Sequence, residues 1–361
     1  MRKRIATAIG VSAAAALVLA ACGGSDDTAS EEVVVEEAAA TGGTACVILP
    51  DSQSSDRWEN QDRPALQAAF EAAGFTANIQ NAQGDTTQYV TIGDQMLAEG
   101  CGVMVLTDLN GAGVTVGDKA KAQGIPVIAY DRPFVADYYV SFDNVGVGKL
   151  QGEGLLKCLG DKGVDVAKAQ IVFLNGSPTD GNAAMFKEGY QTTLEAAGVK
   201  PVKDESVPDW DNQQGGVIFE QMFTDLGGKI DGVLAANDGL GGAAIAVLDK
   251  NGVMLPVTGQ DATVGGLQNV LLGKQCMTVW KDTTKEAAAA ANLAIALLNG
   301  ERPTAPATYT TADGVEVPAV YETPQIIYAA NVSDVVASGQ VDVAELCAGD
   351  VAAKCTEFGV Q

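Results

Sequence analysis

Charged and polar side chains recur at the ends of the strands that this sequence predicts. Asp131 and Arg132 follow one strand, Asn237 follows another, and Asp261 and Lys281 follow two more. Carboxylate, amide and guanidinium groups can each meet two neighbouring sugar hydroxyls at once, and charge-assisted hydrogen bonds are the stronger kind. Asp131 beside Arg132 supplies an acceptor and a donor fork together. The pattern therefore favours a site for a polyhydroxylated ligand.

Each of these positions also has a simpler explanation, because Asn and Asp are favoured helix caps and turn residues after any strand. For an isolated position, such as Asp238 at the start of a predicted helix, capping is the better interpretation. The interpretation as a site depends on the repetition of polar residues at equivalent strand ends, accompanied by cations and tryptophans.

Two tryptophans add apolar surface to this set. Trp58 lies in the segment SSDRWENQD and Trp210 in VPDWDNQQ, among polar residues and not on an apolar helical stripe. Indole rings placed above and below a sugar bury its C–H faces and fix its orientation. We therefore expect both indoles at the site and not in a core. Trp280 lies inside a predicted strand, where we expect it to pack.

Composition and motifs exclude several classes of enzyme. The sequence contains no histidine, which excludes Ser-His and Cys-His nucleophilic sites and His-ligated metal sites. No phosphate-binding loop occurs in it, and no GxGxxG follows a predicted strand. A glycoside hydrolase needs only paired carboxylates, but Arg57, Arg132 and Lys281 would keep these ionised and unsuited to general-acid catalysis. We expect a binding protein with no catalytic residue, metal or cofactor.

The elements that must position these residues alternate along the chain. From Cys46 onward, short β-branched runs alternate with alanine-rich segments of helical period, which predicts parallel α/β sheets. The predicted strands span residues 46–50, 76–81, 102–108, 125–131, 138–143, 170–175, 201–207, 231–236, 256–260 and 275–281. The predicted helices span residues 64–73, 88–99, 114–123, 181–197, 213–225, 240–251, 264–272 and 284–298. Two such arrays predict two doubly wound domains joined by a hinge, with the ligand between the carboxyl ends of their strands.

The N-terminal residues have the pattern of an export signal. Arg2, Lys3 and Arg4 precede an apolar run that ends in Leu19-Ala20-Ala21-Cys22. A small-residue site followed at once by Cys predicts a lipoprotein signal peptide over residues 1–21, with lipidation of Cys22. Residues 22–43 are acidic, small and free of aromatics, as expected of a flexible tether. The predicted location is the cell envelope, on the outer face of the cytoplasmic membrane.

The net charge of −24 restricts the partners. A protein with this much negative charge repels phosphate backbones and anionic lipid surfaces. We therefore expect no nucleic-acid partner, and we expect attachment to the membrane through the covalent lipid alone.

Setting aside Cys22, six cysteines remain, an even number in an oxidising compartment, which predicts disulfides. Cys46 and Cys101 open two strands expected to be neighbours, and Cys347 and Cys355 flank one short loop. Cys158 with Cys276 is the remaining pair.

Seven motifs together carry a family resemblance over residues 46 to about 328. In order they are Asp56-Arg57-Trp58, Ala129-Tyr130-Asp131-Arg132, Ser141-Phe142-Asp143-Asn144, Gly176-Ser177-Pro178 with Asn182, Asn237-Asp238, Gly259-Gln260-Asp261-Ala262, and Met277-Thr278-Val279-Trp280-Lys281. The chain resembles periplasmic sugar-binding proteins of ABC transporters with the type I fold, and among these most closely the D-xylose-binding proteins.

The resemblance implies a function and a set of ligand contacts. It implies a monomer that captures a monosaccharide, D-xylose or a similar aldopentose, between two lobes and delivers it to the permease of an ABC transporter. Relatives that accept arabinose, glucose or galactose share the pattern, and a ligand-sensing module of a membrane receptor uses the same fold. The implied sugar contacts are Arg57, Trp58, Asp131, Arg132, Asn182, Trp210, Asn237, Asp261 and Lys281. The implied lobes are residues 44–142 with about 282–322, and residues 143–281 with about 323–345, followed by a tail over 346–361.

Overall fold

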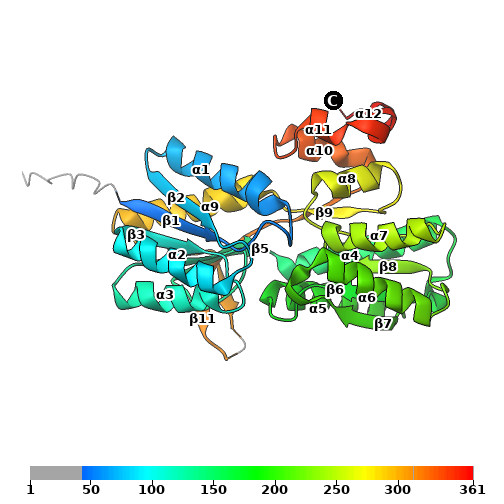
Figure 1. The fold of residues 1–361 in the computed structure, drawn as a ribbon, viewed down its shortest axis with the longest axis horizontal. Helices are drawn as coiled ribbons and strands as arrows, with labels where there is room; N and C mark the ends of the chain where they lie inside the picture. Colours follow the sequence, from blue (N-terminus) through cyan, green and yellow to red (C-terminus); the bar gives the residue numbers. More distant parts are fainter. Residues whose placement is uncertain (1–42, 312, 361) are drawn as a thin grey trace, which may run out of the picture. The chain divides into compact units, whose positions relative to one another are not determined.

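A seven-stranded sheet holds the strands of the first half of the chain. The computed structural model describes residues 43–311 and 313–360, and the strand order in this sheet is β10-β11-β5-β4-β3-β1-β2 (Figure 1). All neighbours are parallel except β10 and β11. The strands are β1 (Thr44–Leu49), β2 (Thr76–Asn81), β3 (Cys101–Leu106), β4 (Val127–Tyr130), β5 (Tyr138–Phe142), β10 (Ala307–Thr310) and β11 (Glu316–Glu322). The sequence analysis missed the last two.

Helices cover both faces of this sheet, so successive residues of each central strand enter opposite cores. Val47 packs with α1 (Arg63–Ala72) and α9 (Thr283–Leu298). Its neighbour Ile48 packs with α2 (Thr86–Ala98) and α3 (Ala112–Ala122). This is why the strands read as continuous apolar runs. A π-helix, η1 (Trp58–Asp62), precedes α1 directly and carries Trp58.

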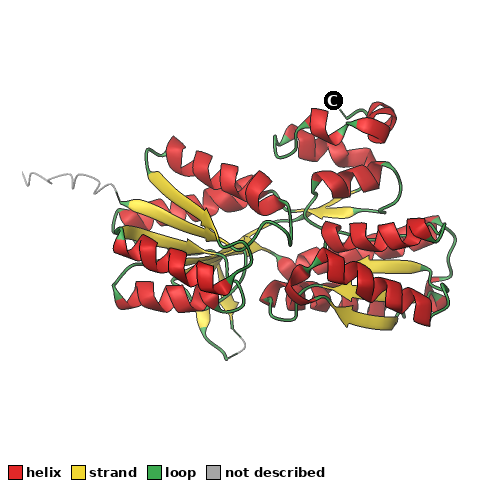
Figure 2. Cartoon of the chain, in the orientation of Figure 1, coloured by secondary structure: helices red, strands yellow, loops and turns green. Residues whose placement is uncertain are grey.

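A second parallel sheet, of order β7-β6-β8, holds the strands of the second half. It comprises β6 (Ile171–Asn175), β7 (Pro201–Ser206) and β8 (Gly232–Ala235). Helices surround it in Figure 2, and their bounds are α4 (Asn144–Asp161), α5 (Gly181–Ala196), α6 (Asn212–Asp225), α7 (Asp238–Lys250) and α8 (Val264–Leu271). Two short 3-10 turns are η2 (Val166–Lys168) and η3 (Pro208–Trp210).

Two predicted strands of the second half differ from the structure. The predicted strand over 256–260 is reduced to one bridge between Val233 and Val257. The predicted strand over 275–281 shortens to β9 (Thr278–Trp280), which pairs antiparallel with β12 (Gln325–Ile327) and not with the parallel sheet. The partner strand β12 lies more than 40 residues after β9 in the chain, and its three residues are too few to show a periodicity.

The 18-residue helix α4 is missing from the sequence predictions because of its glycines, which lower helix propensity. Those glycines serve the contact with α5. A Cβ atom on Gly148 would overlap the carbonyl oxygen of Phe186, and a Cβ on Gly189 of α5 would overlap the carbonyl oxygen of Val145. Only glycine lets the two helix backbones approach this closely.

The C-terminal segment forms short helices that pack on α8, where the sequence analysis assigned residues up to about 345 to the second lobe and 346–361 to a tail without predicting a helix. Their bounds are η4 (Ala329–Asn331), α10 (Val332–Ala337), α11 (Val343–Leu346), η5 (Gly349–Val351) and α12 (Ala352–Phe358). Apolar residues such as Val335 and Leu346 share a core with Leu267 of α8 and with Trp280. The expected packing role of Trp280 agrees with this core.

Three disulfides join Cys46 to Cys101, Cys158 to Cys276 and Cys347 to Cys355. These are the pairings expected from the sequence. The first links the starts of β1 and β3, and the second links α4 to the segment before β9.

The predicted signal peptide, the lipidated Cys22 and the tether before Gly43 lie outside the described residues. Within the described part of the chain, no helix combines the length and apolar character that a membrane span requires. The predicted boundaries of the two lobes stay a prediction.

Candidate functional site

One small cavity collects every predicted contact residue. The cavity measures about 30 Å³, and strand ends and loops of both sheets contribute to its wall. The predicted residues that line it are Arg57, Trp58, Asp131, Arg132, Asn182, Trp210, Asn237, Asp261 and Lys281. Ser54, Ser55, Asp180, Phe186 and Gln260 complete the lining. That these side chains contact a ligand stays a prediction.

Arg57 lies at the centre of a buried network of charges. Its Nε and Nη2 donate to the two carboxylate oxygens of Asp62, at 2.8 and 2.7 Å. Nη1 lies 2.9 Å from Oδ2 of Asp131, and Nη2 donates to Oε2 of Glu286 at 2.9 Å. Burial opposes the charge of Arg57, but the surrounding carboxylates raise its pKa well above its usual value. The guanidinium therefore stays charged with only 2% of its side chain exposed.

Asp131 is the acidic group at which the network meets the cavity. Besides Arg57, its carboxylate accepts a hydrogen bond from Nδ2 of Asn182 at 3.0 Å and lies 3.9 Å from Nζ of Lys281. Burial alone would raise the pKa of Asp131, but Arg57 and Lys281 outweigh burial and lower it below its usual value. Asp131 is therefore an ionised acceptor, which suits hydroxyl binding and not general-acid catalysis.

Lys281 lies between the carboxylates of Asp131, after β4, and Asp261, in the loop before α8. Its Nζ is 3.1 Å from Oδ1 of Asp261. Oδ2 of Asp261 accepts a hydrogen bond from Oγ of Ser55 at 3.0 Å, which joins the loop after β1 to the loop before α8. Asn237, which follows β8, makes a second link to the loop after β1, because its Nδ2 donates to the carbonyl of Ser54 at 3.2 Å.

The expected partnership of Asp131 with Arg132 is wrong. Arg132 instead pairs through Nε with Oδ2 of Asp180 at 3.1 Å, and its Nη1 donates to the carbonyl of Asp108 at 3.0 Å. Asp131 has a left-handed backbone, with φ of 61°, and the two adjacent side chains have separate partners. Arg57, far away in the sequence, lies closer to the Asp131 carboxylate, at 2.9 Å, than Lys281 does at 3.9 Å.

The two tryptophans line the cavity and also belong to hydrophobic cores, so the expectation that they lie outside a core is wrong. Trp58 is 3% exposed, and the guanidinium groups of Arg57 and Arg132 lie 4.6 and 5.5 Å from its ring centroid. Trp210 is 5% exposed, and its Nε1 donates to Oδ2 of Asp180 at 3.0 Å. Each ring packs on one side and borders the cavity on another.

Backbone strain is concentrated around this cavity. Asp131, Trp210 and Asp261 have φ values of 61°, 57° and 97°, in a region that residues other than glycine rarely adopt. Strained conformations persist where the surrounding structure holds them, and they cluster at functional sites. Here the backbone carbonyl of Asp131 accepts hydrogen bonds from Tyr139, Ser141 and Asn182.

The sequence analysis missed the acids behind the cavity wall. Asp62 and Glu286 are both fully buried, and burial raises the pKa of each while Arg57 opposes the shift. Glu286 had a detectable signal, because it lies on the buried alanine-rich face of α9 together with Ala290 and Ala294. A carboxylate on an apolar helical stripe needs a buried partner.

Asp238 does not have the capping role expected of it. Asn237 caps α7, with its Oδ1 accepting from the backbone N–H of Leu240 at 2.9 Å. The Asp238 carboxylate instead accepts hydrogen bonds from Gln275, Thr278 and the backbone of Thr263, at 2.8, 2.8 and 2.9 Å. It therefore holds the start of α8, which follows Asp261, to the segment that enters β9.

Burial, with Asp261 nearby, raises the pKa of Asp238 to about 7. Between its unfolded pKa, about 4, and this value the folded chain binds the extra proton, so the free energy of unfolding falls as pH rises. We expect Asp238→Asn to flatten this fall, which reaches about 1.4 kcal/mol per pH unit for one group. Urea unfolding at about pH 5 and about pH 7 measures the slope, with Asp350→Asn at an exposed position as control. An unchanged slope in Asp238→Asn would contradict the assignment.

Comparison with known proteins gives consistent relatives. Residues 46–302 match the family described as "Periplasmic binding protein domain". The chain is 33% identical over 297 residues to the D-xylose-binding periplasmic protein of Escherichia coli strain K12, covering 79% of this chain and 87% of that protein. A crystal structure of an ABC transporter solute binding protein from Clostridium phytofermentans, with bound β-D-glucose, has 27% identity and a TM-score of 0.75, over 84% of this chain and 99% of that one. A carbohydrate transporter solute binding protein from Chloroflexus aurantiacus, in complex with D-glucose, has 26% identity and a TM-score of 0.74, over 83% of this chain and 97% of that one.

Proposed function

The chain belongs to the family of periplasmic binding proteins, and from this we propose that it binds a monosaccharide, D-xylose or a similar aldopentose, in the cavity around Asp131. We propose further that it delivers the sugar to the permease of an ABC transporter. The chain has the type I fold of this family and is a binding protein and not an enzyme.

The observation that carries the proposal is the chemistry of the cavity wall. Carboxylates, amides and cations line it together, and two indole rings border it. Each hydroxyl of a sugar both donates and accepts a hydrogen bond. A wall that carries carboxylates beside cations offers an acceptor and a donor to each hydroxyl. Oε1 of Gln260 is buried and has no hydrogen-bond partner among the described residues. An unsatisfied buried group of this kind costs about 1–3 kcal/mol, which a sugar hydroxyl would recover.

Entry of a sugar requires the cavity walls to separate. A cavity of about 30 Å³ has room for about two water molecules. The hydrogen bonds of Ser55 to Asp261 and of Asn237 to Ser54 join opposite walls. Breaking these few bonds by a hinge motion would admit a ring, and closure would surround it.

Isothermal titration with D-xylose, L-arabinose, D-glucose and D-galactose tests the proposal. We expect D-xylose to bind with a Kd of about 1 μM or below, near −8 kcal/mol. We expect the hexoses to bind about tenfold or more weakly, because the small cavity must expand to take the extra hydroxymethyl group. Tighter binding of D-glucose would contradict the pentose preference alone. If none of the four sugars binds, the proposed function is wrong.

Membership in this family implies a location outside the cytoplasm. We propose that the mature chain is a monomer held at the membrane by lipid on Cys22, because Leu19-Ala20-Ala21-Cys22 has the order of a lipobox. We also propose the lobe division given by the sequence, 44–142 with about 282–322 against 143–281 with about 323–345.

A further inference from the structure

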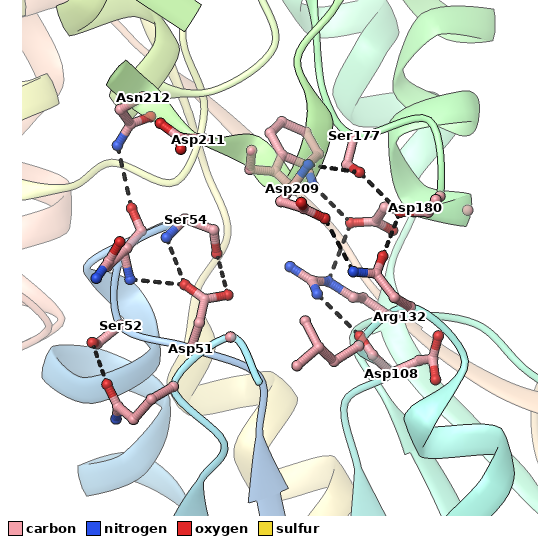
Figure 3. A pocket seen from close by; sticks show the side chains of 18 of the residues that line it. Asp51, Ser52, Ser54, Asp108, Arg132, Ser177, Asp180, Asp209, Asp211 and Asn212 are labelled. Carbon is pink, nitrogen blue, oxygen red and sulfur yellow. Dashed lines mark hydrogen bonds and ion pairs between the residues drawn. The ribbon is translucent and has the colours of Figure 1, made fainter. Parts of the chain in front are cut away.

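A second, larger pocket adjoins the proposed sugar cavity. It measures about 500 Å³, within the range of roughly 300–1,000 Å³ that is usual for ligand pockets. Ser54, Arg132, Asp180 and Trp210 line both the cavity and this pocket. These four side chains therefore lie between the two spaces, and the separation of the walls that entry of a sugar requires would connect them; Figure 3 shows the pocket from close by.

Hydrogen-bonding groups from both halves of the chain line the outer pocket. Nδ2 of Asn110, in the loop after β3, donates to Oδ1 of Asp209 at 3.0 Å. Nδ2 of Asn212, at the start of α6, donates to the carbonyl of Gln53 at 3.3 Å. Further donors and acceptors on the wall are Ser52, Gln83, Ser177, Thr179 and Gln213. Hydroxyls and amides of this kind both donate and accept, as the hydroxyls of a sugar do.

The backbone between the two spaces is strained. Asp209 and Trp210 are consecutive residues with φ of 54° and 57°. The Trp210 ring lies directly against Gly176, where a Cβ atom would overlap it. Strain held in place by packing is typical of functional sites, and an indole on a shared wall offers an apolar surface to a ring on either side.

The charge of the outer pocket limits the ligand class. Among the described residues that line it, the one cation is Arg132, and the carboxylates are Asp51, Asp56, Asp108, Asp180, Asp209 and Asp211. Such a wall repels uronic acids and sugar phosphates, while carboxylates accept hydrogen bonds from neutral hydroxyls. The wall therefore excludes an anionic ring, and an uncharged, polyhydroxylated ring finds acceptors for its hydroxyls there.

We propose that the outer pocket is a second sugar subsite, which holds the second ring of a neutral pentose disaccharide while the first ring occupies the cavity. The proposal rests on the proposed function of the cavity. It extends the ligand class from a free pentose to a short pentose oligosaccharide.

Isothermal titration of the full chain with D-xylose and with β-1,4-xylobiose tests the subsite. We expect xylobiose to bind about tenfold more tightly than D-xylose, which corresponds to about 1.4 kcal/mol. The variant Gln213→Trp places an indole on the wall of the outer pocket from an exposed helix position. Because this larger side chain occupies space that the second ring needs, it should weaken xylobiose about tenfold or more and leave D-xylose within about twofold.

Two further variants make the test specific. Gln221→Trp is the matched control, because Gln221 is exposed on the same helix α6 and does not line the pocket. It should change neither affinity. Asp209→Asn removes one carboxylate at a left-handed position that Asn tolerates, so it tests the subsite without added bulk and should weaken xylobiose alone.

The outcomes separate the two proposals. If D-xylose binds and xylobiose binds no better, the subsite proposal is wrong and the proposed function stands. Xylobiose binding that neither Gln213→Trp nor Asp209→Asn weakens would also overturn the subsite. If neither sugar binds, the proposed function fails together with the subsite.

Discussion

Replacing Asp131 by Asn is expected to weaken sugar binding about 100-fold or more. A hydrogen bond to a charged group contributes about 1.5–3 kcal/mol, and the two carboxylate oxygens of Asp131 can accept from two neighbouring sugar hydroxyls. Asn keeps the shape of the side chain and tolerates the left-handed backbone. The change therefore removes the charge with little added strain, and Arg57 and Lys281 lose the carboxylate that they share.

Isothermal titration of Asp131→Asn with D-xylose measures this effect, and circular dichroism checks that the variant is folded. The matched control is Asp85→Asn at the exposed N-cap of α2, where Asn caps equally well. The control should bind as the unaltered chain does. A folded Asp131→Asn variant with unaltered affinity would remove Asp131 from the site.

Replacing Arg57 by Met is expected to lower the free energy of unfolding by about 3–5 kcal/mol, the usual cost of breaking a buried ion pair from one side. Met fills much of the same space without the charge. The carboxylates of Asp62 and Glu286 would then be buried without their cation. Urea unfolding at about pH 8 measures the loss, and a loss below about 1 kcal/mol would contradict the central role of Arg57.

The pH dependence of Arg57→Met has a definite sign. Burial already raises the pKa values of Asp62 and Glu286 with Arg57 present, and without it both carboxyls should bind protons still more readily in the folded state. The loss in the free energy of unfolding should therefore be largest at alkaline pH, and it should shrink as pH falls through the raised pKa values. The double variant Arg57→Met with Glu286→Gln should recover part of the loss, because it removes one stranded charge.

Local sequence pattern was sufficient for most of the parallel strands and for the polar side chains that meet at their ends. Carboxyl ends of parallel strands meet at one edge of a sheet, so Asp131 after β4 and Asn237 after β8 were expected to face a common ligand. The structure places both on one cavity. The pairing of Cys46 with Cys101 followed from the same reasoning, because their strands are neighbours.

Features that depend on distant partners were not predictable. Glu286 lies 229 positions from the guanidinium that it binds, and no local pattern specifies that pair. Arg132 is adjacent to Asp131 but pairs with Asp180, because strain at one residue changes the direction of the next. The C-terminal helices are too short for a periodicity, with four residues in α11 and seven in α12.

The close backbone contact between α4 and α5 has a consequence for how ligand preference can change. Helix α5 carries Asn182 and Phe186, which both border the cavity. Its distance from α4 is fixed by main-chain atoms at Gly148 and Gly189, and not by side chains that could adopt other rotamers. A glycine-to-alanine substitution at Gly148 or Gly189 would shift α5, and with it one wall of the cavity, without altering any residue that lines the cavity. Substitutions at this helix contact, whether natural or engineered, can therefore change the shape of the cavity and with it the ligand preference.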